Sequence, residues 1–194
     1  MKHVILTIVL LLASGLVIAQ TKMSDQLSKT TKMNAQSKIY FAGGCFWGVE
    51  YYMKKAPGVL AVESGYIGGK VEDPSYEEVC EGNTGHVEAV RVLFDASKTD
   101  YETLTKLFFE IHDPTQQDHQ GPDYGEQYRS EIFYNSPEQK AVAEKLIQEL
   151  KEKGYAVVTR LAPTTTFWVA EDYHQNYYTR KGTLPYCHGY MRRF

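Results

Sequence analysis

The sequence predicts an α/β domain in which helices pack on a mixed β-sheet. Short strand-like runs alternate along the chain with segments that have helical apolar spacing, which favours this class. The 43% hydrophobic and 23% charged residues are typical of a globular protein, and 194 residues suit one domain. A net charge of −3 is too small to indicate a nucleic acid or an acidic membrane as partner.

The N-terminus predicts a secretory signal peptide over residues 1–19. Lys2 and His3 precede an apolar run that begins at Val4 and continues to about Ala19, where cleavage is expected. The alternative is an uncleaved membrane anchor, since the run falls just short of the roughly 20 residues that a span needs. Residues 20–37 are polar and predict a flexible linker. The folded domain is therefore expected at 38–194, in a protein that is exported to a periplasm or secreted.

Three strands and one helix are predicted in the first half of the domain. A strand at 38–42 ends at two glycines, and a helix follows over 46–55 until Pro57-Gly58 ends it. Residues 59–66 have strand character. Residues 87–94 alternate apolar and polar side chains most regularly, which predicts the central strand.

Two capped helices and two strands are predicted in the second half. Thr99 and Glu102 form a capping-box pattern before a helix that ends by Pro114, and Ser136 begins a helix that stops at Gly154. Strands are predicted at 128–134 and 155–161. Two segments do not fit this pattern. Residues 110–128 form a long polar loop, which in a compact domain is usually functional, and residues 185–194 form a short tail.

Cys45 has an unusual setting, after Gly43 and Gly44 and before Phe46 and Trp47. A helix that starts here places its unpaired backbone N–H groups next to the sulfur, which lowers a thiol pKa from about 8.5. The glycines permit a sharp turn that leaves the sulfur accessible. Cys45 is thus a predicted nucleophile, with a small buried hydrophobe as the alternative. The two aromatic residues either wall an apolar cup or pack in the core.

The chain has three cysteines, Cys45, Cys80 and Cys187. That number is small and odd, which argues against a disulfide-stapled scaffold. No two of them form a CxxC pair, which excludes a zinc ribbon and a thioredoxin-like motif. A thiol left over in an exported protein needs a functional reason.

Several segments resemble, in the same order, sequence blocks of the A-type peptide methionine sulfoxide reductases. The resemblance covers about residues 38–187. It rests on GCFWGVE (44–50), GYIGG (65–69), DPSYEEVCEGNTGHVEAV (73–90), HDPTQ (112–116) and QGPDYGEQYRS (120–130).

The resemblance implies a fold and a reaction. The fold is a two-layer sandwich related to ferredoxin-like folds. The reaction is thiol-dependent reduction of methionine-S-sulfoxide, in proteins and as the free amino acid, to methionine. Cys45 would attack the sulfoxide sulfur, and Glu88 would protonate its oxygen, which otherwise leaves poorly. Burial would raise the pKa of Glu88, as a proton donor requires, although an exposed strand-end carboxylate is the simpler reading of that residue. Tyr76 and Tyr128 would hydrogen-bond the sulfoxide oxygen.

The family motifs also imply a substrate site and a recycling step. Asp123 would accept the backbone N–H of the substrate methionine, and Phe46 and Trp47 would cup its S-methyl group. The attack leaves Cys45 as a sulfenic acid, which Cys187 would convert to a disulfide once the two Cα atoms approach within about 7 Å. An external dithiol of thioredoxin type then reduces that disulfide, so no bound cofactor and no metal are expected.

The match to the family is incomplete at two places. Many members have Asn-Arg where this chain has Asp118-His119, which could alter the surroundings of the substrate. Some members have two recycling cysteines, whereas this tail has one, so we expect a single disulfide between Cys45 and Cys187. Cys80 is interpreted as a small buried residue, with a recycling role as the alternative. Nothing resembles the B-type reductases, so only the S epimer is the expected substrate.

Three other readings remain to be weighed. Glu171-x-x-His174 could place two metal ligands on one helix face, but no second ligand pair has suitable spacing. A secreted, non-catalytic binding module could use one of the cysteine pairs as a structural disulfide. A peroxidase would also use a low-pKa cysteine, but it would not need Glu88 and the two tyrosines. A monomer is the expected state.

Overall fold

The computed structural model describes residues 36–194, so the predicted signal peptide and nearly all of the predicted linker lie outside the described residues. The first strand begins at Gln36, two residues before the expected start of the domain. Within the described part of the chain, every helix is too short or too polar to cross a bilayer.

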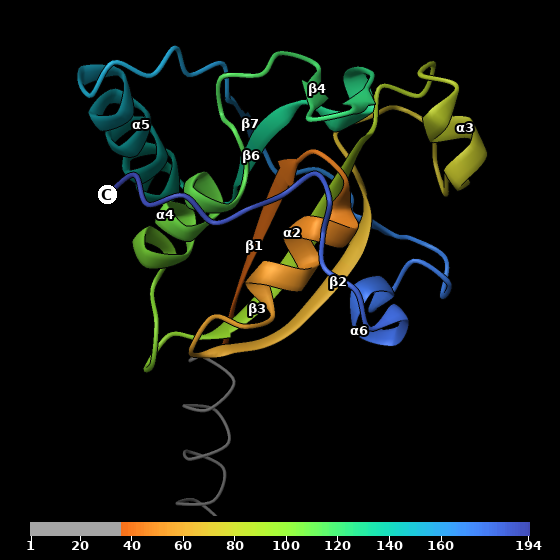
Figure 1. The fold of residues 1–194 in the computed structure, drawn as a ribbon, viewed down its shortest axis with the longest axis horizontal. Coiled ribbons are helices and arrows are strands. Elements are labelled where there is room, and N and C mark those ends of the chain that lie inside the picture. The colour runs from red at the N-terminus through yellow and green to blue at the C-terminus, as the bar shows by residue number, and fades with distance from the viewer. Residues whose placement is uncertain (1–35) are drawn as a thin grey trace, which may run out of the picture. The chain divides into compact units, whose positions relative to one another are not determined.

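A six-stranded mixed sheet forms the centre of the domain (Figure 1), as the sequence predicts. Its order is β7-β6-β1-β3-β2-β8. β6 and β7 pair in parallel, whereas β1 with β6, β2 with β3, and β2 with β8 are antiparallel. The strands are β1 (Gln36–Gly43), β2 (Val59–Ile67), β3 (Val87–Asp95), β6 (Ser130–Tyr134), β7 (Arg160–Pro163) and β8 (Trp168–Val169).

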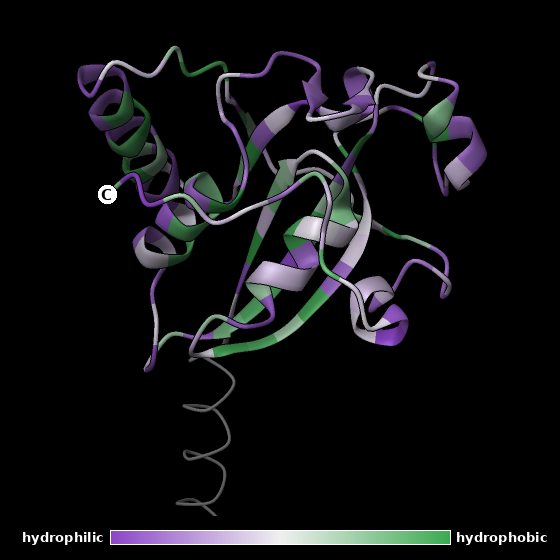
Figure 2. Ribbon diagram, in the orientation of Figure 1, coloured by the Kyte–Doolittle hydropathy of each residue, from purple (hydrophilic) through white to green (hydrophobic). Residues whose placement is uncertain are grey.

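Helices cover one face of this sheet. α2 (Phe46–Met53) lies over β2 and β3, and α4 (Tyr101–Ile111) packs between α2 and α5 (Pro137–Glu152). Figure 2 shows apolar residues along the strands and on the inner sides of α4 and α5, with polar residues outward on α5. The apolar residues that recur at helical spacing in the sequence are therefore on the sides of α4 and α5 that pack inward.

The start of α4 differs from the prediction. Its N-cap is Asp100, whose carboxylate accepts the backbone N–H of Thr103 at 2.7 Å, so Thr99 is not the capping residue. Asp is as good an N-cap as Ser or Thr, and Asp100 directly follows Thr99, so the sequence pattern was ambiguous by one position. Ser136 caps α5 as predicted. A complete capping box occurs instead at Ser75 and Glu78.

Several short elements were not predicted. They are α3 (Tyr76–Cys80), α6 (Tyr177–Lys181), β8, and a hairpin of β4 (His119–Gln120) and β5 (Asp123–Tyr124) inside the long polar loop. Each has five residues or fewer, too short for a periodic pattern to be read. The last predicted strand, 155–161, was wrong in position, because β7 starts only at Arg160.

The alternation of β3 decides which side chains face the helices. Val90, Val92 and Phe94 belong to the core cluster that also contains Phe46 of α2, whereas Val87 belongs to a smaller cluster on the opposite face. Because side chains alternate along a strand, Glu88 lies on the same face as Val90. The carboxyl group therefore points into the helix-covered layer, beside the first turn of α2.

Candidate active site

Cys45 occupies the predicted position between β1 and α2. It is the N-cap residue of α2 and is 6% exposed. Gly44 before it has φ +88°, a conformation that favours glycine, and a Cβ there would lie 2.4 Å from the Gln120 side chain. The two-glycine turn thus sets the sulfur at the helix start, although the sulfur is more enclosed than the sequence suggests.

The pKa of Cys45 is raised in this structure, contrary to the sequence prediction. The largest cause is a hydrogen bond with the Cys187 side chain, followed by burial and by the charge of Glu88. The backbone N–H of Trp47 acts in the expected, lowering direction but is outweighed. The helix start alone therefore does not keep Cys45 ionised while the tail thiol is in place.

Glu88 is the buried acid of the site. Its side chain is 2% exposed, and burial raises its pKa to about 8. The backbone N–H of Phe46, one of the unpaired donors of the α2 N-terminus, donates to Glu88 Oε2 at 3.0 Å. This bond holds the carboxyl beside Cys45. The raised pKa means that Glu88 carries a proton at neutral pH, which agrees with the expectation for a proton donor.

Two tyrosine phenols lie around this carboxyl. Burial, and then electrostatic repulsion that includes the charge of Glu88, raise the pKa of Tyr128, and burial also raises the pKa of Tyr76. Both phenols are therefore hydrogen-bond donors at physiological pH. Tyr76 lies at the start of α3 and Tyr128 at the end of a 3-10 turn (Glu126–Tyr128), so the fold brings together two segments far apart in sequence.

Phe46 and Trp47 follow the nucleophile on the first turn of α2. Phe46 is buried in the main core, in contact with Tyr66, so it is at least a core residue. Trp47 is only half-buried, and its indole is fixed on both sides. Its Nε1–H donates to His174 Nδ1 at 3.0 Å, and its ring stacks on Tyr177 with centroids 3.6 Å apart. A fixed, half-exposed indole beside the sulfur is a suitable wall for an apolar group.

The C-terminal tail brings Cys187 to Cys45. The two sulfur atoms and one carboxylate oxygen of Asp123 all lie within 4.8 Å of one another. The Cys187 pKa is lowered to about 6, mainly by the hydrogen bond from Cys45 and then by His188. The contact with Cys45 and the imidazole of His188 thus both favour loss of the Cys187 proton.

The tail also occupies the surroundings of Asp123. The Tyr186 hydroxyl donates to Asp123 Oδ1 at 2.9 Å, while the buried Oδ2 has no partner among the described residues. A surface cavity of about 670 Å³ borders α4 and includes none of the predicted site residues. The tail therefore lies directly against Cys45 and Asp123, with the Cys187 sulfur and the Tyr186 hydroxyl next to them.

Cys80 is exposed, so its interpretation as a small buried residue was wrong. It ends α3, whose apolar contact with the core is made by Val79 instead. Partial burial raises its pKa, and the neighbouring Tyr76 side chain acts in the opposite, lowering direction. It is absent from the cluster that Cys45 and Cys187 form.

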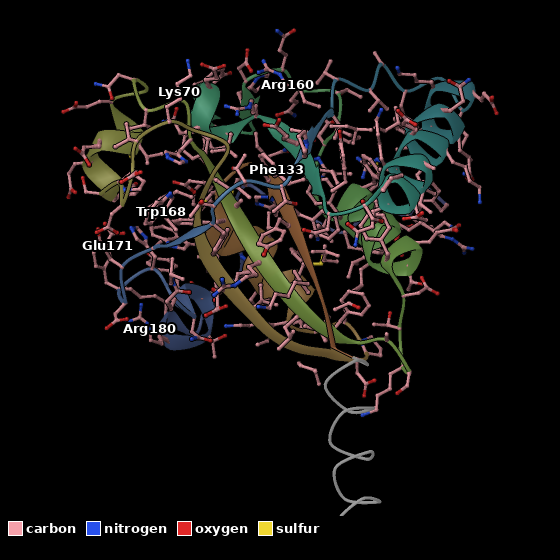
Figure 3. The ribbon with its side chains drawn as sticks, turned by 180° about the vertical axis from the view of Figure 1, so that it is seen from behind. Lys70, Phe133, Arg160, Trp168, Glu171 and Arg180 are labelled. Atoms are coloured by element: carbon pink, nitrogen blue, oxygen red, sulfur yellow. The ribbon has the colours of Figure 1, made fainter. Side chains whose placement is uncertain are left out.

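Glu171 and His174 have structural partners. The Glu171 carboxylate accepts the Tyr66 hydroxyl and the backbone N–H of Tyr76, each at 2.9 Å, which ties α3 to the segment after β8. Figure 3 shows Glu171 on this segment, near Trp168. His174 accepts the Trp47 indole N–H. These bonds give both side chains structural roles and position two of the predicted site residues, Tyr76 and Trp47. The buried Nε2 of His174 has no hydrogen-bond partner among the described residues and lies 3.8 Å from Glu171 Oε2.

The sequence did not predict the role of His188. Its imidazole contacts Cys187 and lies next to α2, 145 residues from its hydrogen-bond partner Gly43. The only available signal was its position directly after a candidate redox cysteine.

Taken together, the residues can act on an oxidised sulfur atom. The site has a nucleophilic thiol, a protonated acid, two phenolic donors and a second thiol within reach of the first. A thiol pair can form a disulfide after one oxygen atom has been transferred, and the acid can protonate that oxygen as it leaves.

Comparisons with known proteins agree with this chemistry. The family model for peptide methionine sulfoxide reductase matches residues 37–193. A protein of that name, MsrA, from Methanosarcina mazei is 44% identical over 189 residues, covering 91% of this chain and 90% of that protein. The Thermus thermophilus MsrA is 52% identical over 147 residues, covering 75% and 84%.

Solved structures give the same result. The reduced form of Mxr1 from Saccharomyces cerevisiae has a TM-score of 0.75 and 32% identity, over 83% of this chain and 94% of that one. The methionine sulfoxide reductase A of Corynebacterium diphtheriae has a TM-score of 0.70 and 34% identity, over 79% and 78%.

Proposed function

The chain belongs to the peptide methionine sulfoxide reductase family, and we infer that it reduces methionine-S-sulfoxide in proteins to methionine. The observation that carries this inference is the cluster of Cys45 and Cys187, with the buried carboxyl of Glu88 hydrogen-bonded to the backbone N–H of Phe46, the residue after Cys45. The reaction uses the protein's own thiols, and the reducing equivalents come from an external dithiol. The site residues below are assigned on the same basis.

The first step transfers the sulfoxide oxygen to Cys45. The Cys45 thiolate attacks the sulfoxide sulfur while Glu88 gives its proton to the oxygen, which Tyr76 and Tyr128 hydrogen-bond. The products are methionine and the sulfenic acid of Cys45. Tyr186 already bonds Oδ1 of Asp123, and Oδ2 is buried, so we propose that the tail moves aside to let the substrate's backbone N–H reach this carboxylate and returns for recycling.

The second step forms the Cys45–Cys187 disulfide and releases water. Cys187 also borders a small cavity of about 270 Å³, lined by the tail and by the polar loop after α4. An external dithiol of thioredoxin type can approach Cys187 from this side, reduce the disulfide and return the enzyme to its starting state.

The activity is tested by steady-state assay with separated epimers of N-acetyl-methionine sulfoxide and excess dithiol. We expect turnover of the S epimer and none of the R epimer. Turnover of neither epimer by folded protein would refute the proposed function and would favour a non-catalytic binding module.

Cys187→Ser is expected to separate the two steps. The variant should form one methionine per chain and then stop, because serine cannot attack the sulfenic acid. Methionine released per chain, with a thioredoxin as reductant, is the quantity to measure. Continued cycling would show that Cys187 is not the recycling residue and would assign that role to Cys80.

We also propose that the protein is exported. The support is the sequence alone, in which Lys2 and His3 precede an uncharged apolar run. The intact mass of protein purified from its native cells should correspond to a chain that starts near Gln20. A full-length chain recovered from the membrane would instead indicate an uncleaved anchor.

A further inference from the structure

The His188 side chain is buried against the start of α2, in direct contact with the recycling thiol. It is 7% exposed, and its Nδ1 lies 3.1 Å from Cys187 Sγ. Its Nε2 lies 2.7 Å from the carbonyl oxygen of Gly43, two residues before the nucleophile. One imidazole thus connects the tail thiol to the turn that carries Cys45.

The two contacts determine the tautomer of the ring. A carbonyl oxygen can only accept a hydrogen bond, so Nε2 must carry the proton that it donates to Gly43. In the neutral ring, Nδ1 then has a free lone pair, and that lone pair faces Cys187 Sγ. His188 is therefore oriented to accept the Cys187 thiol proton.

The glycine pattern of the α2 start makes room for this ring. A Cβ on Gly48 would lie 2.2 Å from His188 Nδ1 and 2.6 Å from Cγ, and one on Gly44 would lie 3.3 Å from Cε1. Glycine inside a helix costs roughly 0.5–1 kcal/mol relative to alanine. Gly48 is in α2 and has no turn to form, so the space that it leaves for the imidazole accounts for its presence.

We propose that His188 is a catalytic residue of the recycling step, the general base that removes the proton from Cys187 as it attacks the Cys45 sulfenic acid. This inference deepens the proposed function and depends on it. In this proposal His188 acts in disulfide formation, the second step of the cycle, and has no part in the reduction of the substrate.

The proposed step is balanced as follows. Cys187 gives its proton to His188 Nδ1, and the resulting thiolate attacks the sulfur of Cys45–SOH. The S–S bond forms as the S–O bond breaks, and Cys45 loses hydroxide. The proton from Cys187 and the departing hydroxide together make one water. No oxidant beyond the sulfenic acid is needed.

Other titratable groups face the same pair and contribute to its pH dependence. The charge of Asp123 opposes ionisation of Cys187, and Glu88 is held neutral up to about pH 8. His112 stays uncharged because burial lowers its pKa to about 3. Asp113 and Arg193, which carry opposite charges, border the small cavity beside Cys187. Cys45, Tyr178 and Tyr186 also lie near Cys187 and are neutral at pH 7.

His188→Gln is the discriminating variant. The glutamine amide can still donate to Gly43, but it has no basic nitrogen beside Cys187. A free thiol with a pKa of about 8.5 is only about 3% ionised at pH 7, so disulfide formation should slow by about 10–30-fold. The deficit should disappear near pH 9.5, where the thiol ionises unaided. The rates of methionine formation and of disulfide formation are both measured in one rapid-quench single turnover, in which methionine and the disulfide are quantified separately.

The two measured species separate failure of this inference from failure of the proposed function. If methionine forms at one per chain but the disulfide forms as fast as in the wild type at pH 7, His188 is not the base. An equal slowing at every pH from 7 to 9.5 would also overturn the proposal, since it would indicate a purely positional role. If no methionine forms in the wild type, the proposed function itself has failed.

A second measurement avoids replacing His188. In Cys45→Ser protein, the thiolate absorbance of Cys187 near 240 nm should titrate with a pKa below the roughly 8.5 of a free thiol, because His188 remains beside Cys187.

In Gly48→Ala the added methyl group should displace the imidazole, and disulfide formation should slow with the same rescue at high pH. Gly189→Ala is the matched control, because a Cβ there meets nothing within 4 Å. Unchanged rates in Gly48→Ala would contradict the proposal.

Discussion

Replacing Cys45 with serine should abolish sulfoxide reduction, lowering the rate by more than about 10⁴-fold, the scale expected when a nucleophile is removed. A hydroxyl at this position has nearly the size of the thiol, but it is hardly ionised at neutral pH. The hydrogen bond from the Trp47 N–H can still form, so we expect the fold to persist. Methionine formed in a single turnover is the quantity to measure.

Cys80→Ser is the matched control for this substitution. Cys80 is exposed and lies outside the cluster that contains the other two thiols, so this variant should retain wild-type turnover. Residual activity above about 1% in Cys45→Ser would contradict the nucleophile assignment.

Replacing Glu88 with glutamine should slow the first step by about 10²–10⁴-fold, the usual contribution of a general acid. The amide keeps the shape of the carboxyl and can accept from the Phe46 N–H, but it cannot give a proton to the leaving oxygen. In the wild type, Glu88 is protonated below its pKa of about 8. Once the tail thiol, the largest cause of the raised Cys45 pKa, has moved away and Cys45 is ionised, the rate should fall about tenfold per pH unit above that value. The alkaline limb should be absent in the variant.

Stability gives a control on the same variant. The unfolded carboxyl ionises near pH 4.3, whereas burial raises the folded pKa to about 8. The folded state therefore holds an extra proton between these values, and its stability falls as pH rises through that window. From pH 5 to 8 the wild type should lose on the order of 3 kcal/mol more than Glu88→Gln. Equal losses in urea titrations would show that Glu88 is not protonated in the fold.

The local parts of this site could be predicted from the sequence. The strand, two glycines and helix around Cys45 are encoded in adjacent residues, and Gly44 has the left-handed φ that such a turn requires. The raised pKa of Glu88 was expected from the family resemblance, whereas the strand pattern alone favoured an exposed carboxylate. The alternation of β3 explains why the residue is buried, because it places Glu88 among buried apolar neighbours.

Features that depend on distant contacts could not be predicted in the same way. The raised pKa of Cys45 results mainly from Cys187, and the slot for His188 is formed by Gly44 and Gly48, about 140 residues earlier in the chain. Trp47 is held by His174 and Tyr177 from a segment whose short helix gives no periodic signal. Even the exposure of Cys80 depends on which side of a five-residue helix meets the core.

The most direct test of this account is a count of thiols in a single turnover. Reduced protein would be mixed with one equivalent of the S epimer without external reductant, and the remaining thiols would be alkylated and located by peptide mapping. We predict one methionine per chain, loss of two of the three thiols, and Cys80 as the one that remains free. One methionine formed with Cys80 in the disulfide, or with no disulfide at all, would contradict the relay from Cys45 to Cys187.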